Sequence, residues 1–231
     1  NTLVISNYSR GIEQMFGDLV VFADREPNRL ANLDKASIDA LRQRAMTEVL
    51  SQHTYAKRWR YMLQCIGFAV QSESDAVTLV SRIDSDKQAV AAISQFEEQF
   101  SRQSNYRLLL VVTANVSDID VAAFYQRYNR FGIAVTSESF MKKHALIEHY
   151  QPIETPYYLL FAGNTAPASD WLQRAQLHLS YLSEHPISLA GKEQYQLQQV
   201  PPDAVFLGHA KDFMPMYRSV MAGTAQLAYK V

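Results

Sequence analysis

The 231-residue sequence predicts an α/β protein with a mostly parallel sheet flanked by helices. Strand-like and helix-like segments alternate along most of the chain, which is the pattern of a parallel sheet with helical crossovers. The clearest strand, Tyr106–Val112, is a nearly continuous apolar run, as expected for a strand buried on both faces. Hydrophobic residues make up 48% of the chain and charged residues 19%, so the composition supports a packed core and argues against disorder.

A small strand–helix–strand–helix unit is predicted at the start of the chain. Its segments are Leu3–Ile5, Ile12–Phe16, Leu19–Ala23 and a long helical region from about Ser37 to Gln64. Apolar residues recur at spacings of three and four in the long region, at Ile38, Leu41, Ala45 and Val49. This spacing predicts a helix with one buried face.

A second, larger part follows a polar connection at residues 71–75. Its predicted strands are Ala76–Val80, Tyr106–Val112, Ile133–Val135, Tyr157–Phe161 and Ile187–Ala190, and Ala225–Val231 is also strand-like. Its predicted helices are a segment capped by Ser85 and Asp86 that runs to about Phe100, then Val121–Tyr128, Ser139–Tyr150 and Asp170–Leu182, the last capped by Ser169. We therefore expect two domains, at residues 1–70 and 76–231.

Charge and cysteine content exclude several classes of function. The net charge of -1 gives no reason to expect a nucleic-acid partner or an acidic membrane surface. The one short basic run, Lys57–Arg60, is interpreted as the solvated face of a helix. The single cysteine, Cys65, excludes an internal disulfide and a cysteine-based zinc cluster, and its apolar neighbours favour a buried, inert thiol.

Targeting signals are missing from the sequence. No apolar run approaches the ~20 residues that a membrane-spanning helix needs, and no secretory signal opens the chain. We therefore expect a soluble, cytoplasmic protein without a transmembrane segment. The chain begins directly on a strand, which favours a segment of a longer protein.

The stretches Leu3–Phe16 (LVISNYSRGIEQMF) and His53–Arg58 (HTYAKR) carry a first resemblance. They resemble the C-terminal end of a GT-B glycosyltransferase of the spore maturation protein type, which implies that residues 1–70 are part of such a domain. The resemblance also implies that Glu13 binds the ribose of the nucleotide-sugar donor. A carboxylate can accept two hydrogen bonds from a diol, although Glu13 can equally serve to complement the N-terminus of its helix.

The second part resembles the nucleotide-sugar half of a GT-A glycosyltransferase of the inverting family two. The matching order is a strand opening into Val80–Ser81, a long helix, the strand Leu108–Val112, the stretch Glu154–Phe161, and a polar loop that leads into Asp170–Leu172. The resemblance implies a Rossmann-like, truncated GT-A fold over residues 76–231. It also implies a nucleotide sugar and a glycan acceptor as ligands, and other domains of a parent glycosyltransferase as partners.

The metal-binding motif of that family is altered in this chain. In active members the strand equivalent to the one ending at Phe161 delivers two aspartates that bind Mn²⁺ or Mg²⁺. Ala162 and Asn164 stand at these positions, and a neutral amide is a poor ligand for a hard cation. We therefore expect no metal cofactor. Asp170 lies further along and is interpreted as favourable charge in the first turn of its helix.

Several polar side chains remain as candidates for binding a nucleotide sugar. They are Ser81, Arg82, Asp84, Asn115, Asp118 and Asn164, together with Glu13 in the first unit. Asn115 and Asp118 can also be ordinary loop residues that bond their own backbone, and Ser85 and Asp86 are explained as helix caps. The catalytic base is unassigned, because Glu193, Asp203 and His209 qualify only by their chemistry.

Two hypotheses about function follow. The first is a glycosyltransferase that transfers sugar from a nucleotide sugar, for example to a surface polysaccharide, without the usual metal. The second is a degenerate, non-catalytic glycosyltransferase-like module that acts as a scaffold or binding domain in a larger protein. Donor binding separates them, because an enzyme must recognise the nucleotide diphosphate whereas a scaffold need not.

Overall fold

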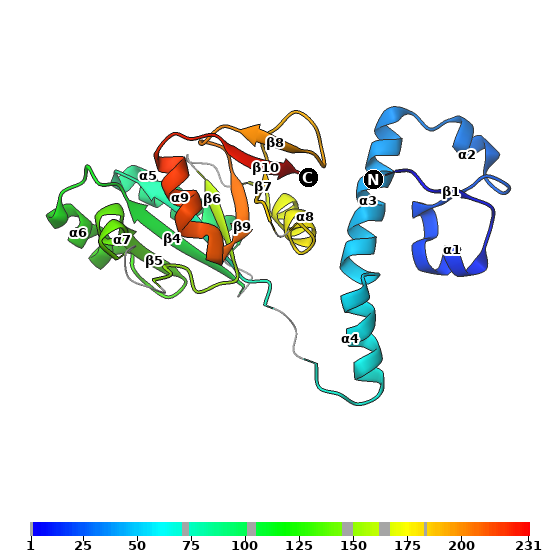
Figure 1. Ribbon diagram of the computed structural model, residues 1–231, viewed down its shortest axis with the longest axis horizontal. Helices are drawn as coiled ribbons and strands as arrows, with labels where there is room; N and C mark the ends of the chain where they lie inside the picture. Colours follow the sequence, from blue (N-terminus) through cyan, green and yellow to red (C-terminus); the bar gives the residue numbers. More distant parts are fainter. Residues whose placement is uncertain (1, 71–73, 101–104, 145–149, 162–166, 183) are drawn as a thin grey trace. The chain divides into compact units, whose positions relative to one another are not determined.

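The computed structural model describes residues 2–70, 74–100, 105–144, 150–161, 167–182 and 184–231. The chain forms two compact units, Asn1–Ser72 and Glu73–Val231 (Figure 1). The second unit contains the large sheet and most of the predicted site residues.

Two short parallel strands organise the first unit. β1 (Ile5–Ser6) pairs with β2 (Val21–Phe22), and α1 (Arg10–Phe16) followed by a 3-10 turn at Gly17–Leu19 connects them. Three helices follow, α2 (Pro27–Ala31), α3 (Lys35–Gln52) and α4 (Tyr55–Cys65). The buried hydrophobic residues of this unit, among those described, are Leu19, Val20, Val21, Phe22 and Leu41.

The helical region predicted from Ser37 to Gln64 is in fact two helices. The Thr54 hydroxyl accepts a hydrogen bond from the Lys57 amide at 3.2 Å, and Thr54 has an extended backbone. The chain therefore caps a new helix here instead of continuing α3. The predicted buried face is only partly formed, because Leu41 is buried whereas Val49 is 38% exposed.

Four parallel strands form the first half of the sheet in the second unit. They are β3 (Val77–Ile83), β4 (Tyr106–Val112), β5 (Ile133–Ser137) and β6 (Tyr157–Phe161). They lie in the order β5-β4-β3-β6, so β4 and β5 flank one side of β3 and β6 flanks the other. This is the strand order of half a Rossmann-like sheet, and the predicted α/β class is confirmed.

The second half of the sheet is mixed rather than parallel. It comprises β7 (Ile187–Ser188), β8 (Leu197–Val200), β9 (Phe206–His209) and β10 (Gln226–Lys230). β9 runs antiparallel to both β6 and β7, while β10 pairs parallel with β7 and antiparallel with β8. β8, β9 and the helix α9 (Phe213–Met221) are additions to the elements expected from the sequence.

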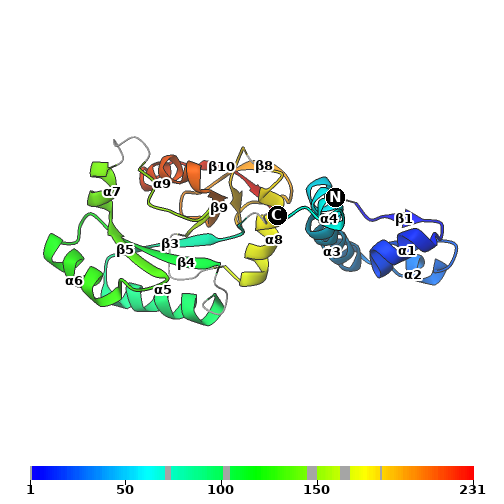
Figure 2. The ribbon, with the colours of Figure 1, turned by 90° about the horizontal axis from the view of Figure 1, so that it is seen from below.

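Helices cover both faces of the sheet (Figures 1 and 2). Residues of α5 (Asp86–Gln99), α6 (Asp118–Tyr128) and α8 (Ser169–Leu179) share one hydrophobic cluster with Leu108, Leu110 and Val112 of β4. Residues of α7 (Glu138–His144) and α9 share the other with Leu109 and Val111. Alternate residues of β4 thus face opposite layers, which confirms the prediction of a strand buried on both faces.

The predicted starts or caps of three helices differ from those in the structure. α6 begins at Asp118, three residues before the prediction, because the Ser117 hydroxyl accepts a hydrogen bond from the Asp120 amide at 3.2 Å. Ser85 precedes α5 but makes no capping hydrogen bond with its side chain, and Ser169 is the first residue of α8 rather than its cap. The predicted continuation of α7 falls on residues 145–149, which lie outside the described residues.

Candidate functional site

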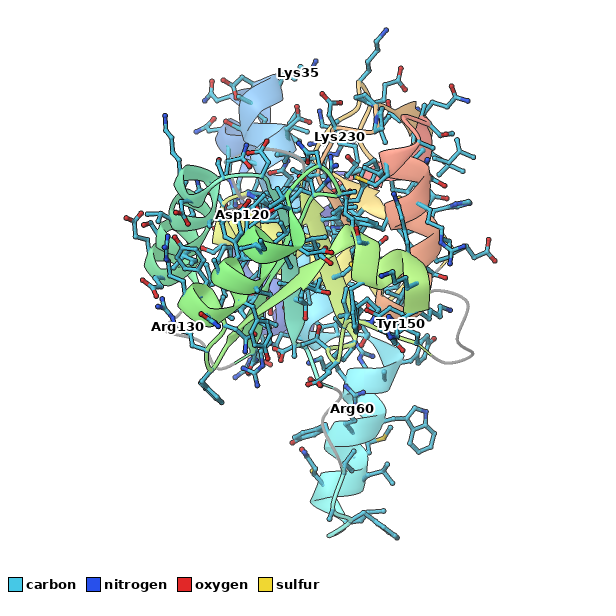
Figure 3. The ribbon with its side chains drawn as sticks, turned by 90° about the vertical axis from the view of Figure 1, so that its left-hand side faces the viewer. Lys35, Arg60, Asp120, Arg130, Tyr150 and Lys230 are labelled. Atoms are coloured by element: carbon cyan, nitrogen blue, oxygen red, sulfur yellow. The ribbon has the colours of Figure 1, made fainter. Side chains whose placement is uncertain are left out.

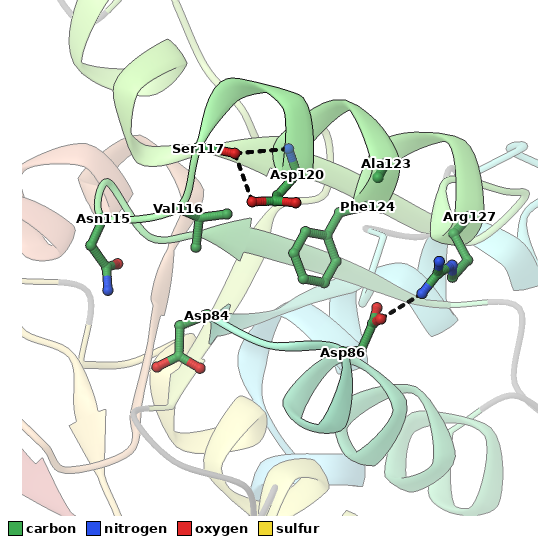
Figure 4. Close-up of a pocket in the computed structure, with 9 residues that line it drawn as sticks. All are labelled: Asp84, Asp86, Asn115, Val116, Ser117, Asp120, Ala123, Phe124 and Arg127. Atoms are coloured by element: carbon green, nitrogen blue, oxygen red, sulfur yellow. Dashed lines mark hydrogen bonds and ion pairs between the residues drawn. The ribbon is translucent and has the colours of Figure 1, made fainter.

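The candidate site lies at the carboxyl ends of β3 and β4. Parallel α/β sheets bind ligands outside this edge, because the loops and the positive ends of the following helices converge there. The loops after these strands, the start of α5 and one side of α6 bound a cavity of about 530 Å³ (Figure 4). The residues that line it are Asp84, Asp86, Asn115, Val116, Ser117, Asp120, Ala123, Phe124 and Arg127.

Three of the four charged groups of the cavity already have hydrogen-bond partners. The Asp86 carboxylate accepts hydrogen bonds from the Tyr128 hydroxyl at 2.9 Å and from Arg127 at 2.5 Å, and these two donors hold the pKa of Asp86 below its ordinary value. Asp120 accepts a hydrogen bond from the Ser117 hydroxyl at 2.6 Å (Figure 4). The Asp84 carboxylate, by contrast, has no partner among the described residues. It is therefore the acceptor most available to a ligand.

A buried carboxylate, Glu138, lies behind this edge on the other face of the sheet. Its side chain is 7% exposed, and Arg82 approaches its Oε1 with both Nε and Nη2 at 2.9 Å. The Tyr217 hydroxyl donates to Oε1 at 2.9 Å, and the Ala114 amide donates to Oε2 at 3.0 Å. Glu138 therefore joins β3, the loop after β4, the start of α7 and helix α9.

The electrostatics of Glu138 follow from these contacts. Burial alone would raise the pKa of Glu138, but the hydrogen bonds from Ala114 and Tyr217 and the charge of Arg82 hold it below its ordinary value. Burial and the Glu138 carboxylate raise the pKa of Tyr217, so Tyr217 stays a neutral donor. Glu138 is not among the site residues expected from the sequence. The available signal was Arg82 itself, because a charge inside a buried strand needs a partner.

The structure brings two of the predicted site residues together and separates the others. Asp84 and Asn115 line the same cavity. Asp118 lines a different cavity of about 440 Å³, next to Tyr125 and Phe140. Ser81 is 3% exposed within β3, and Arg82 is engaged by Glu138, so neither lines the 530 Å³ cavity.

The remaining predicted residues lie elsewhere. Glu13 belongs to the first turn of α1 and accepts a hydrogen bond from the Tyr8 hydroxyl at 2.8 Å. Asn164 and Ala162 fall outside the described residues. Glu193, Asp203 and His209 do not line the cavity.

The described part of the chain has neither a cluster of metal ligands nor a helix suited to span a membrane. Within it, no group of three or more histidine, cysteine, aspartate or glutamate side chains is arranged to hold a metal ion. Among the described helices, none has the length and apolar character needed to cross a bilayer.

The fold and this edge define a Rossmann-like α/β unit with a cavity at the carboxyl ends of its strands. Among solved structures, the chain is similar to the mannosyltransferase PcManGT from Pyrobaculum calidifontis, determined in complex with GDP-Man and Mn2+, with 12% identity and a TM-score of 0.36. That similarity covers 78% of this chain and 52% of PcManGT, so the chain spans about half the length of that protein.

A second similar structure is the apo-form glycosyltransferase GlyE from Streptococcus pneumoniae TIGR4, with 10% identity and a TM-score of 0.35. Here the similarity covers 64% of this chain and 38% of GlyE. No protein-family model matches the sequence, and no curated protein matches it.

Proposed function

We propose that the second unit is a glycosyltransferase-type module that binds the nucleoside part of a nucleotide sugar in the 530 Å³ cavity. The observation that carries the proposal is the position of Asp84 and Asn115, which follow two neighbouring parallel strands and line one cavity at their carboxyl ends. A carboxylate and an amide can together accept from and donate to the edges of a base and the hydroxyls of a ribose.

The charge of the cavity favours the neutral half of such a ligand. Its lining includes three aspartates and one arginine, and that arginine is already bound to Asp86. A diphosphate placed among these carboxylates would be repelled, whereas hydroxyl and amine donors would be attracted. The proposal therefore places the base or ribose inside the cavity and the diphosphate outside it.

The sequence resemblances extend this proposal. Residues 76–231 would be a GT-A domain of the family-two type and residues 1–70 part of a GT-B domain of a parent glycosyltransferase. A glycan, for example a surface polysaccharide in the cytoplasmic phase of its assembly, would be the acceptor.

A second candidate function is a degenerate, non-catalytic binding module. It is favoured by the engagement of Arg82, the side chain that a metal-independent enzyme would need for the diphosphate, with the buried Glu138. A module that recognises only part of the donor, or none of it, does not need a free cation at this place.

Calorimetric titration of the whole chain with UDP, GDP, dTDP and UDP-sugars, with and without Mn²⁺, tests the proposal. Asp84→Asn and Asn115→Ala should each weaken binding about tenfold, because each removes a hydrogen-bonding partner of the ligand. Asp118→Asn is the matched control, since this aspartate lies on the same helix as Asp120 but lines the other cavity, and it should leave the affinity unchanged.

The outcomes separate the two functions. Binding without metal that depends on Asp84 supports the proposal. Binding that requires Mn²⁺ would contradict the expectation drawn from Ala162 and Asn164. Absence of binding to every nucleotide would refute nucleoside recognition and leave the degenerate module.

A further inference from the structure

Helix α4 carries an exposed apolar stripe. Tyr55, Trp59, Met62 and Ile66 follow one another at spacings of four, three and four, so they share one side of the helix. Their exposed fractions are 87%, 60%, 48% and 69%, respectively, and α4 has no buried residue. We call these four residues the α4 stripe.

The end of α4 extends this surface. Gly67 adopts a left-handed conformation with φ of 86°, and the Phe68 amide donates to the Leu63 carbonyl at 3.0 Å. This is the Schellman arrangement, in which the residue after the glycine packs beside the last turn of the helix. Phe68 is 63% exposed and therefore adds a further aromatic ring to the apolar side.

Helix α4 also carries basic residues, of which Lys57 and Arg58 are exposed. Lys57, Arg58 and Arg60 lie on α4, and no aspartate or glutamate occurs between His53 and Val70. Arg58 and Arg60 directly precede and follow Trp59, so they lie about 100° away from it on either side of the helix. Figure 3 shows Arg60 on α4.

We propose that α4 docks on the surface of an anionic lipid bilayer, with the α4 stripe inserted among the headgroups and the cations facing the lipid phosphates. Interfacial helices have this composition, with tryptophan and aliphatic residues on one side and basic residues on the other. Long basic side chains beside an apolar stripe can keep their stems on it while their charges reach the phosphates.

The positive charge of α4 favours an anionic bilayer over a second copy of the chain as its binding partner. Two α4 helices packed through their stripes would bring together four exposed cations, Lys57 and Arg58 of each copy, with no carboxylate of α4 to offset them. The net charge of -1 does not reveal the local positive charge of α4, because it is a sum over the whole chain. Lys57, Arg58 and Trp59 are exposed, as expected for the solvated face of a helix. Cys65 is also exposed, which corrects the expectation of a buried thiol.

Flotation of the whole chain with vesicles tests the inference, using phosphatidylcholine alone and phosphatidylcholine mixed with phosphatidylglycerol. The chain should float with the anionic vesicles, less so at high salt, and its tryptophan emission should shift to the blue. The shift reports on Trp59, because the other tryptophan, Trp171, is only 6% exposed in the free protein.

Variants locate the binding surface. Lys57→Gln with Arg58→Gln should lower partitioning about 25-fold, since each cation near an anionic surface contributes about fivefold. Trp59→Ser with Ile66→Ser should lower it more than about tenfold through lost apolar burial. All four residues are exposed, so the fold should persist, and circular dichroism checks this.

Matched controls come from exposed residues of the second unit. Lys87→Gln with Lys142→Gln removes the same charge, and Ile119→Ser removes an apolar side chain that is 82% exposed. Equal binding to neutral and anionic vesicles would overturn the inference, as would α4 variants that behave like these controls. Self-association of the free chain that Trp59→Ser abolishes would also overturn it and would assign the stripe to a second copy.

Discussion

Replacing Glu138 with alanine removes the acceptor that joins four segments of the second unit. The change leaves three donors without it, namely the Arg82 guanidinium, the Ala114 amide and the Tyr217 hydroxyl. Each buried donor left unsatisfied costs about 1–3 kcal/mol. Arg82 is 36% exposed and can be rehydrated, so its share lies at the low end. We expect the free energy of unfolding of this unit to fall by about 3–5 kcal/mol, as for other broken buried pairs.

Urea titration followed by tryptophan fluorescence measures this loss. Trp59→Phe serves as the background for all variants, so that the signal comes from Trp171 of α8 and reports on the second unit alone. Glu97→Gln is the control, because Glu97 pairs with Arg130 at the surface and its loss should cost less than about 1 kcal/mol. A loss for Glu138→Ala no larger than that of the control would refute the joining role of Glu138.

The pH dependence gives an independent check. The pKa of Glu138 is lower in the folded state than in the unfolded chain, so its stabilisation is complete above the unfolded value and is lost as the pH falls through the folded one. The stability difference between the wild type and Glu138→Gln should be constant above about pH 5 and should shrink below about pH 4. A difference that grows on acidification would contradict this sign.

Three further predictions concern buried groups of the second unit. Tyr158→Phe should be neutral or stabilising by about 1 kcal/mol in urea titration, because its buried hydroxyl has no partner among the described residues; a loss above that size would reveal one. Gly208→Ala should cost about 1–3 kcal/mol by overpacking. The reason is that a Cβ at Gly208 would lie 2.6 Å from the Tyr158 hydroxyl, and the penalty should shrink when Tyr158 is also replaced by alanine. Burial, and to a lesser extent the charge of Arg174, lowers the pKa of His178 in the folded state. The unfolded chain therefore binds a proton first, and the wild type should lose stability as the pH falls below about 6.5. His178→Gln should remove this component from the measured pH profile, and an unchanged profile would contradict the assignment.

The parallel strands could be predicted because their own residues determine them. The predicted strands Tyr106–Val112 and Tyr157–Phe161 have the same bounds in the structure. An apolar run of this length leaves the solvent on both sides of the strand only when both faces of the sheet are covered. β8 could not be predicted, because its two central residues are Gln198 and Gln199 and it forms a strand only by pairing with β10. Such a pairing is non-local and leaves little trace in the local pattern.

The candidate site could be predicted only in part for a related reason. Asp84 and Asn115 follow strands directly, so strand order alone places them at one edge. Asp118 and Asp120 depend instead on the helical phase of α6: two residues rotate the side chain by about 200°, which sends one aspartate to each of two cavities. Glu138 at the start of α7 meets Arg82 of β3, Ala114 of the loop after β4 and Tyr217 of α9, and their convergence depends on the three-dimensional packing.

The position of β10 between β7 and β8 has a consequence for biosynthesis. A ribosome releases Val77–Phe161 before the strands β7 to β10, so the four parallel strands can assemble while the rest of the second unit is still being made. β8 has β10 as its strand partner among the described residues, and β10 is translated some 25 residues later. Until then β7 and β8 expose unpaired edges, so slow translation of this stretch would prolong the interval in which a nascent chain can bind chaperones or aggregate.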